Sequence, residues 1–154
     1  EAREHAEARG RKPYARLTGV ATDQSRRRPG DVTAKMARQF DELVPEGTPP
    51  VAMLSGATGV AAATAEERAL LEQLIAAGRV DTVRAPGSLL GNMAGATFPV
   101  LAGLAAMALS RGGFYPPADE SGFERPAPAQ PSRIAVNTIG VWRGEGMGVV
   151  EAVD

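Results

Sequence analysis

The chain has 154 residues, of which 44% are hydrophobic and 23% charged, with 17 Lys and Arg against 18 Asp and Glu. This length suits one domain with a core of its own, and the balanced charge excludes a strong long-range attraction to nucleic acid or to an anionic membrane. Because the chain has no cysteine and one histidine, it excludes disulfides, thiolate metal sites and a cysteine nucleophile. The histidine, His5, lies among charged residues and is expected to face solvent, so no metal site is expected.

The first half of the chain alternates between strand and helix patterns. Its predicted elements are, in order, a short exposed helix at 1–9, a strand at 13–23, a loop at 24–31, an amphipathic helix at 31–44, a buried strand at 48–59, a helix at 62–78 and a strand at 80–86. Asp31 is expected to cap the second helix with its carboxylate. The predicted inner faces of the two longer helices are Val32, Met36, Phe40 and Leu43, and Leu70, Leu71, Leu74 and Ile75. This alternation favours an α/β layer.

An uncharged run from Ala85 to Ser110 dominates the second half. It is rich in Ala and Gly and is expected to form a buried helix that reaches Arg111, with Pro99 in its first turn or at a kink. The run is long enough to span a bilayer, but its small residues favour a protein core. The charged residues 1–12 do not have the apolar core of a signal peptide, so the cytoplasm is the expected location.

The remaining segments predict an irregular connection and a hairpin. Residues 112–132 contain five prolines, and a connection of this length inside one domain is expected to be docked or functional. Residues 133–140 and 146–154 flank a glycine-containing turn and predict two paired strands. Together, residues 1–154 are expected to form one domain.

Three short stretches attract a functional interpretation, and each also has a plainer one. The consecutive Arg26, Arg27 and Arg28 are either solvated or a docking point for an acidic carrier domain or a phosphate. The turn that contains Ser55 has glycines, but their spacing matches neither a phosphate loop nor a dinucleotide fingerprint. In GSLLGNMAGA, Asn92 is either a helix cap or a hydrogen-bond donor aimed into a cavity. The pattern leaves these alternatives open.

Four segments, in this order, resemble the C-terminal half of a β-ketoacyl synthase, the condensing enzyme of fatty-acid and polyketide synthesis. EHAEARGRKPYARLTGVATD is similar to the opening of that half, and VAMLSGATGVAAATAEERALLEQL to the strand, loop and helix that carry a His-Gly-Thr signature. VRAPGSLLGNMAGATFPVLAGLAAMALSRGGFYPP is similar to the Lys-containing loop, the second active-site His and the long helix after it. IAVNTIGVWRGEGMGVVEAV is similar to the closing glycine-rich hairpin.

The resemblance covers nearly the whole chain and implies a fold. That fold is of the α/β class and thiolase-like, with a mixed five-stranded sheet that has helices on its faces. It would be the C-terminal half of a duplicated α/β/α/β/α architecture and would pack on an N-terminal half that carries the Cys nucleophile. In that family, two His and a nearby Lys of the C-terminal half bind the thioester oxygen and assist decarboxylation of the extender.

The departures from this pattern bear on function. Ser55 stands at the first His position, Gly87 at the Lys position and Asn92 at the second His position, while the gating Phe and the two glycines after it correspond to Val141, Trp142 and Arg143. Ser55 cannot carry the charge or proton of an imidazole, so the ordinary condensation is not expected. Asn also occurs at the second position in the branch of the family that uses acetyl-CoA, but that branch keeps the first His.

Three functions therefore stay open. The sequence also leaves open whether the chain is part of an enzyme. The first is a ketosynthase-like subunit without condensation chemistry, analogous to a chain-length factor, which completes a dimer and shapes an acyl cavity lined or closed by Val141, Trp142 and Arg143. The second is part of an active acyltransferase or condensing enzyme with Ser55 or Asn92 as oxyanion donors. The third is a structural interaction module. The resemblance implies an N-terminal half, an active ketosynthase and an acyl carrier protein as partners, and no cofactor beyond acyl groups delivered on a phosphopantetheine carrier.

Overall fold

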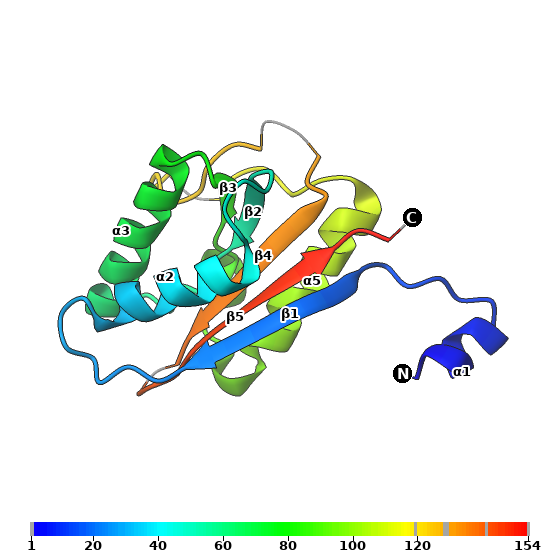
Figure 1. Ribbon diagram of the computed structural model, residues 1–154, viewed down its shortest axis with the longest axis horizontal. Coiled ribbons are helices and arrows are strands. Elements are labelled where there is room, and N and C mark those ends of the chain that lie inside the picture. Colours follow the sequence, from blue (N-terminus) through cyan, green and yellow to red (C-terminus); the bar gives the residue numbers. More distant parts are fainter. Residues whose placement is uncertain (1, 119, 128–129, 141, 154) are drawn as a thin grey trace.

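The computed structural model describes residues 2–118, 120–127, 130–140 and 142–153 (Figure 1). Its helices are α1 (Arg3–Ala8), α2 (Asp31–Leu43), α3 (Ala61–Ala76), α4 (Gly87–Leu90) and α5 (Thr97–Arg111), with a 3-10 turn η1 at Ala94–Ala96. Its strands are β1 (Arg16–Asp23), β2 (Val51–Leu54), β3 (Val80–Arg84), β4 (Arg133–Ile139) and β5 (Glu145–Glu151). Figure 1 shows α1 lying apart from the sheet, and none of its residues is buried.

The five strands form one mixed sheet in the order β1-β5-β4-β2-β3. Strand β2 pairs in parallel with β3 and with β4, whereas β5 lies antiparallel between β4 and β1. Strands β1 to β4 therefore run in one direction, and their carboxyl ends meet at one edge of the sheet. The expected mixed five-stranded sheet is confirmed, and so is the hairpin, whose strands pair from Arg133 with Glu151 to Ile139 with Glu145.

Helices α2 and α3 cover one face of the sheet, and α5 covers the other (Figure 1). Successive side chains of a strand point to opposite faces, so Met53 packs with the α2 and α3 cluster and its neighbours Ala52 and Leu54 pack with α5. The predicted inner faces of the longer helices are confirmed. The residues buried on these helices include Val32, Met36, Phe40, Leu70, Leu71 and Leu74.

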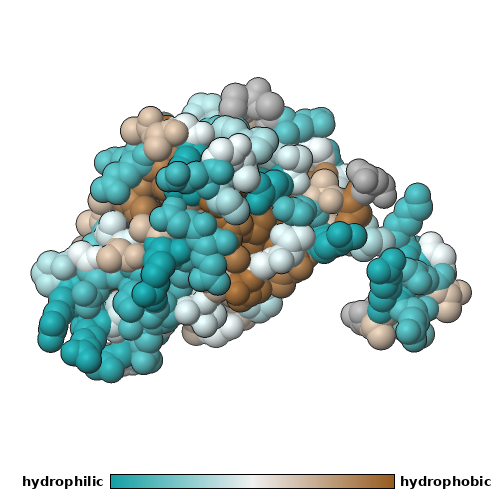
Figure 2. Space-filling model, in the orientation of Figure 1, coloured by the Kyte–Doolittle hydropathy of each residue, from teal (hydrophilic) through white to brown (hydrophobic). Residues whose placement is uncertain are grey.

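The α5 face keeps apolar surface in contact with solvent. Leu101, Ala105 and Leu109 of α5 are buried against the sheet, whereas Met107 on the outer side of the helix is 40% exposed. Val20 of β1 is 51% exposed and pairs with Gly148, at which a Cβ would meet Phe98 of α5. Cross-strand partners share a face, so Val20 also lies on the α5 side. Figure 2 shows an apolar area beside β1, where α5 emerges from behind the sheet.

Two expectations about the helices are wrong. Asp31 does not cap α2: Gly30, with φ of 85°, precedes the helix, and the Asp31 carboxylate accepts the backbone N–H groups of Arg26 and Arg28 instead. The uncharged run is not one buried helix, because a left-handed Gly91 at φ 70° separates α4 from η1 and α5. Within the described residues, Ala94–Arg111 is the one stretch long and apolar enough to cross a membrane, a criterion that core helices also meet; 22% of it is buried.

The irregular connection after α5 is docked onto the sheet, as expected, by two buried charged side chains. Arg84 of β3 donates to the carbonyl oxygens of Tyr115 and Arg125. The Glu124 carboxylate accepts the backbone N–H of Ala85 at 2.8 Å. Besides one backbone bridge between Arg125 and Val83, these hydrogen bonds to charged side chains hold the segment, whose prolines have no N–H to donate.

Candidate functional site

The predicted site residues come together at the edge where the parallel strands end. Ser55 follows β2, Gly87 follows β3, and Asn92 lies between α4 and α5. All three line one narrow pocket of about 10 Å³. Larger pockets adjoin it, one of about 410 Å³ beside α3 and one of about 450 Å³ beside the β4–β5 turn, and Asn92 lines both. The crevice beyond the carboxyl ends of strands is where open α/β sheets bind ligands.

Ser55 is turned away from solvent and toward the core. Its side chain is 0% exposed. The Ser55 hydroxyl oxygen lies 2.5 Å from Oε1 of Glu67 on α3 and accepts the backbone N–H of Ala57 at 3.1 Å. Asn137 of β4 donates from Nδ2 to the same Glu67 oxygen at 2.8 Å. These contacts form a buried polar cluster under the strand ends. The Ser55 hydroxyl is hydrogen-bonded within this cluster.

Burial raises the pKa of Glu67 above its ordinary value of 4.5, while the hydrogen bonds from Ser55 and Asn137 act in the opposite direction. No hydrogen-bond partner is present for Oε2 of Glu67 or Oδ1 of Asn137 within the described residues. A carboxylate without a cation and with one unpaired oxygen is costly in a low-dielectric interior. Glu67 is therefore held toward its neutral, protonated form.

Gly87 lies too close to the neighbouring loop for a side chain. A Cβ atom on Gly87 would lie 2.8 Å from the carbonyl oxygen of Ala57, closer than the packing of a real Cβ allows. The loop after β3 has thus packed onto the loop after β2. The backbone at this position leaves no room for the lysine that the family pattern places there.

We expect the substitution Gly87→Ala to lower the free energy of unfolding by about 1–3 kcal/mol, because the added methyl group meets a backbone carbonyl that cannot rotate away. The matched control is Gly95→Ala, since a Cβ there has nothing within 4 Å. Urea unfolding of both variants measures the difference. Equal stabilities would contradict the close approach of the two loops.

Asn92 is exposed, and a hydrogen bond to the backbone two residues later holds its side chain in place. Its Oδ1 accepts the N–H of Ala94 at 2.8 Å, which leaves the amide NH2 group as the donor available to the pockets. Ala94 has φ of 48°, a conformation that residues other than glycine rarely adopt, and the Asn92 side chain closes this turn. Asn92 can donate a hydrogen bond, but an amide cannot transfer a proton near neutral pH.

The arginine loop divides into one partly buried anchor, Arg27, and two exposed side chains. Arg27 has φ of 60° and donates to the carbonyl oxygens of Gly140 and Trp142 in the β4–β5 turn. Its guanidinium also lies 3.4 Å from Oε1 of the buried Glu145. Arg26 and Arg28 remain exposed. Arg27 is therefore engaged within the fold, and docking through this loop stays a prediction for its two neighbours.

The residues expected to gate the cavity lie at the tip of the same turn. Trp142 is 88% exposed, Arg143 is also exposed, and neither lines the three pockets around Asn92. Val141 lies outside the described residues. The lining or closing role of all three stays a prediction.

The pockets offer hydrogen bonds but no free acid or base among the described residues. Asp23 and Glu145 line the pocket beside the β4–β5 turn. Asp23 is paired with Lys35 at 3.0 Å and with Arg38, and Glu145 is paired with Arg27. No group of three or more His, Asp or Glu side chains in the described part of the chain is placed to hold a metal ion.

Sequence reasoning missed the residues that fix this site. Glu67 follows Ser55 by 12 positions and Asn137 follows Glu67 by 70, so their contacts depend on how the strands assemble. The available signal was a glutamate on the buried side of α3, in register with Leu70, Leu71 and Leu74. Glu145, by contrast, has no such signal in the sequence, because it is the first residue of β5, directly after the turn.

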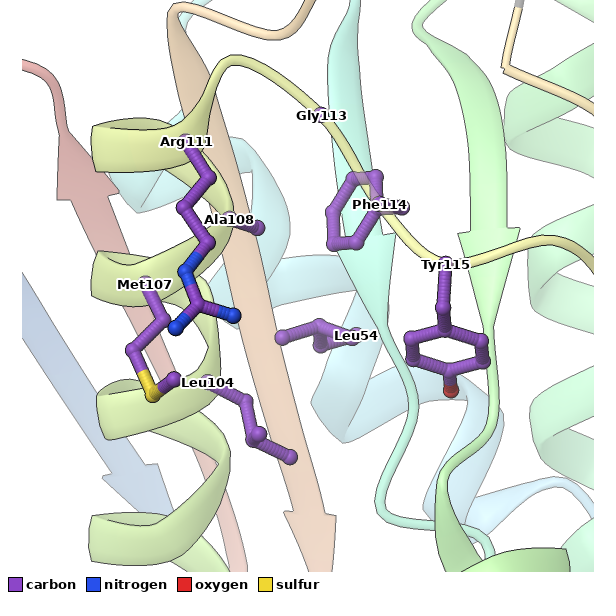
Figure 3. A pocket seen from close by; sticks show the side chains of 8 residues that line it. All are labelled: Leu54, Leu104, Met107, Ala108, Arg111, Gly113, Phe114 and Tyr115. Atoms are coloured by element: carbon purple, nitrogen blue, oxygen red, sulfur yellow. The ribbon is translucent and has the colours of Figure 1, made fainter.

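A separate apolar pocket of about 150 Å³ opens at the other end of α5. Figure 3 shows Phe114 and Tyr115 on one side and Leu104 and Met107 of α5 on the other, with the Arg111 side chain extending along α5 toward Leu54. Its lining offers shape and apolar contact and no group placed for acid–base chemistry. This pocket continues the apolar surface of α5.

No protein-family profile and no curated protein matches the chain, but solved structures do. The ishigamide ketosynthase/chain length factor superposes with a TM-score of 0.75 at 17% identity, over 100% of this chain and 42% of that one. A type II polyketide ketosynthase, bound to a hexaketide and in complex with its acyl-carrier protein, gives 0.76 at 14%, with coverages of 100% and 42%. Ketosynthase twelve of the bacillaene polyketide synthase of Bacillus amyloliquefaciens gives 0.71 at 16%, over 98% and 32%.

The superpositions establish the fold, and at identities of 14–17% they establish the fold alone. The chain spans less than half the length of these three structures, 42% at most. The chain superposes on a part of the ketosynthase chain that is consistent with its C-terminal half. The superposed part includes the mixed sheet, the α2 and α3 helices on one face and α5 on the other. The protein therefore has the thiolase-like fold of the ketosynthases.

Proposed function

We propose that the chain belongs to a ketosynthase-like subunit of polyketide or fatty-acid assembly that has no condensation chemistry of its own. It completes a dimer and shapes an acyl cavity, in the manner of a chain-length factor. The observation that carries this proposal is the sequestered Ser55, whose hydroxyl is bonded to Glu67 and to the N–H of Ala57 inside the core. At the position of an active-site imidazole, the chain thus offers neither a base nor an accessible donor.

The surroundings of Ser55 support the same proposal. The close approach of Gly87 to Ala57 excludes a lysine from its family position without movement of the backbone. Losing one oxyanion donor typically costs about 2.7–4 kcal/mol of barrier, so a site with both the His and the Lys replaced is strongly impaired. Asn92 remains as one neutral donor at the junction of the pockets.

The sizes of the pockets favour a ligand-shaping role over a purely structural module. The two larger pockets measure about 410 and 450 Å³ and adjoin each other at Asn92, within the range of small-molecule sites. A module with only a dimerisation role does not need such a groove at the strand ends.

The exposed apolar surface on the α5 side of the sheet favours a second ketosynthase-like half or subunit packed against it. Val20, Met107 and the apolar pocket of Figure 3 all lie on the α5 side, which one helix covers incompletely. We propose that an N-terminal ketosynthase-like half or subunit packs here and that one of its side chains enters the pocket. The remaining partners are an active ketosynthase and an acyl carrier protein that delivers acyl groups on phosphopantetheine, in the cytoplasm.

Reconstitution with an active ketosynthase and its carrier protein tests the proposal. Adding the full-length protein is expected to change product chain length. Gly95 lines the pocket beside the β4–β5 turn, and a Cβ at this position has nothing within 4 Å, so Gly95→Leu is expected to narrow the pocket and to shorten the product. Ala69→Leu on the exposed side of α3 is the size-matched control and should leave chain length unchanged. Products indifferent to the protein and to Gly95→Leu would overturn the proposal.

The alternative is an active acyltransferase whose Cys nucleophile lies in another part of the protein. The free amide of Asn92 favours it, because that amide could still stabilise a thioester oxygen. A Ser55→Ala, Asn92→Ala double variant separates the two functions. If the double variant loses acyl transfer while the chain length of the partner ketosynthase's products is unchanged, the chain is part of an active acyltransferase. Full acyl transfer by the double variant would exclude that function.

A further inference from the structure

The pocket beside α3, of about 410 Å³, is lined by several hydrogen-bonding side chains and by one cation. Its polar lining consists of the guanidinium of Arg68, the amide of Asn92 and the hydroxyl groups of Thr58, Thr64, Ser88 and Ser121. Among the lining residues in the described part of the chain there is no acidic side chain. A lining with positive charge and no negative charge favours a ligand that carries negative charge.

Arg68 is held at the wall of this pocket by an aromatic ring. Its Cζ atom lies 5.2 Å from the ring centroid of Phe123, a buried residue of the connection after α5. In the described part of the chain, the Arg68 guanidinium has no ion-pair partner. A guanidinium placed over a ring keeps the N–H groups at its edge, and these bind carboxylate and phosphate groups through two parallel hydrogen bonds. Arg68 is thus fixed on one side and has donors for a ligand.

The carboxyl groups that adjoin these residues in the sequence bind other partners. Glu66 accepts two backbone N–H groups at the start of α2. Glu67 is hydrogen-bonded within the buried polar cluster under the strand ends. Glu124 accepts the backbone N–H of Ala85 at 2.8 Å. None of the three therefore neutralises the charge of Arg68.

The beginning of α3 adds further unpaired groups to the same pocket. The Thr64 Oγ1 atom is buried and has no hydrogen-bond partner within the residues that the structure describes. Thr64 and Arg68 are four residues apart, so they lie on one side of the helix, and both line the pocket. No side chain caps α3, and its first turn contains no acidic residue. The positive end of the helix dipole is therefore uncompensated beside these two side chains.

We infer that the pocket beside α3 binds an oxyanion, the phosphate or carboxylate group of a small molecule, with Arg68 as its cation. Thr64 and Asn92 supply further donors, because the Oδ1 of Asn92 already accepts the N–H of Ala94 and its NH2 group faces the pockets. The volume of about 410 Å³ leaves room for the organic part of such a molecule. The inference goes beyond the proposed function, because shaping an acyl chain requires no anion.

Thermal unfolding of the full-length protein in chloride buffer tests the inference with two simple anions. Inorganic phosphate or acetate replaces part of the chloride at constant ionic strength, and glycerol is the neutral probe. A ligand that binds a site on the folded state raises the melting temperature according to its dissociation constant. Phosphate also stabilises folded proteins in general, because it is excluded from their surface, so variants of the site are needed to isolate the specific effect.

Substitutions of Arg68 isolate that effect. Arg68→Gln is expected to weaken anion binding about tenfold or more, because a charged donor is lost. Arg68→Lys keeps the charge but not the planar fork, so it should bind with intermediate affinity. Arg125→Gln is the matched control, because Arg125 is exposed on the same connection as Phe123 and does not line the pocket; it should bind as the parent protein does. Circular dichroism in chloride buffer establishes that each variant is folded.

The outcomes separate the source of the anion from failure of the site. A rise that depends on Arg68 supports the inference; its appearance with phosphate assigns a phosphate group, and its appearance with acetate assigns a carboxylate. Equal rises in Arg68→Gln and the parent protein, or no greater rise with either anion than with glycerol, would overturn it. Equal losses in Arg68→Gln and Arg125→Gln would overturn the assignment to this pocket. The proposed function is judged separately, by the Gly95→Leu effect on chain length.

Discussion

Replacing Glu67 by Gln is expected to stabilise the protein at neutral pH and to have little effect on stability below pH 4.5. The pKa of Glu67 is raised from its ordinary value of 4.5 by burial. The folded state therefore keeps a proton that the unfolded state has already released, and the stability of the parent protein falls as the pH rises above 4.5. Gln is close in shape, needs no proton and retains a donor for the cluster.

The margin between the two proteins should grow with pH by up to about 1.4 kcal/mol per unit until the folded pKa of Glu67 is passed. Urea unfolding between pH 4 and pH 8 measures it, and the other carboxyl groups largely cancel in the difference. Glu66→Gln is the control, because the Glu66 carboxylate accepts the N–H groups of Val32 and Thr33 at the start of α2. Removing that charge should destabilise the protein. A pH-independent margin for Glu67→Gln would contradict a protonated Glu67.

Replacing Arg27 by Ala is expected to lower the free energy of unfolding by about 1–3 kcal/mol. The change leaves the carbonyl oxygens of Gly140 and Trp142 without their donor and the buried Glu145 without its cation. Hydrogen exchange of the backbone amides in the β4–β5 turn should accelerate, because this contact ties the turn to the rest of the fold.

A second variant separates the side chain from the backbone at this position. Arg27 has φ of 60°, so Arg27→Gly loses the same side-chain contacts but gains a residue that adopts this conformation without strain. It should therefore be more stable than Arg27→Ala. Arg26→Ala is the control and should match the parent protein, since the Arg26 side chain is exposed. Equal stability of Arg27→Ala and the parent would exclude the anchoring role.

Hydrophobic periodicity predicts α2 and α3 correctly because each buries one stripe of side chains against a single face of the sheet. Met36 and Phe40 on α2, and Leu70 and Leu74 on α3, are such stripes. For the uncharged run the prediction is right for α5, which ends at Arg111 and has Pro99 in its first turn. It fails between Ala85 and Ala96, where small residues suit a helix, a turn or a close approach equally well. Gly91 and Ala94 adopt left-handed backbone conformations there and break the run. Composition does not reveal which small residue will take that conformation.

The candidate site, like the fold, has a part that the sequence predicts and a part that it does not. The resemblance brings Ser55, Gly87 and Asn92 to one pocket, as the structure places them, although their roles stay predictions. The direction of the Ser55 side chain depends on Glu67 of α3, and Asn137 of β4 donates a hydrogen bond to that same carboxylate. Such partners are selected by tertiary packing of buried polar groups, and single-sequence patterns do not contain that information.

The contact between Gly87 and Ala57 constrains the order in which substitutions can restore a catalytic site. A lysine introduced first at position 87 meets the Ala57 carbonyl and is expected to destabilise the fold. A change that moves the loop after β2 must therefore come earlier, although by itself it supplies no catalysis. Directed evolution toward condensing activity should require this change in the loop after β2 before the lysine at position 87, so libraries that vary position 87 alone are expected to return destabilised variants without condensing activity.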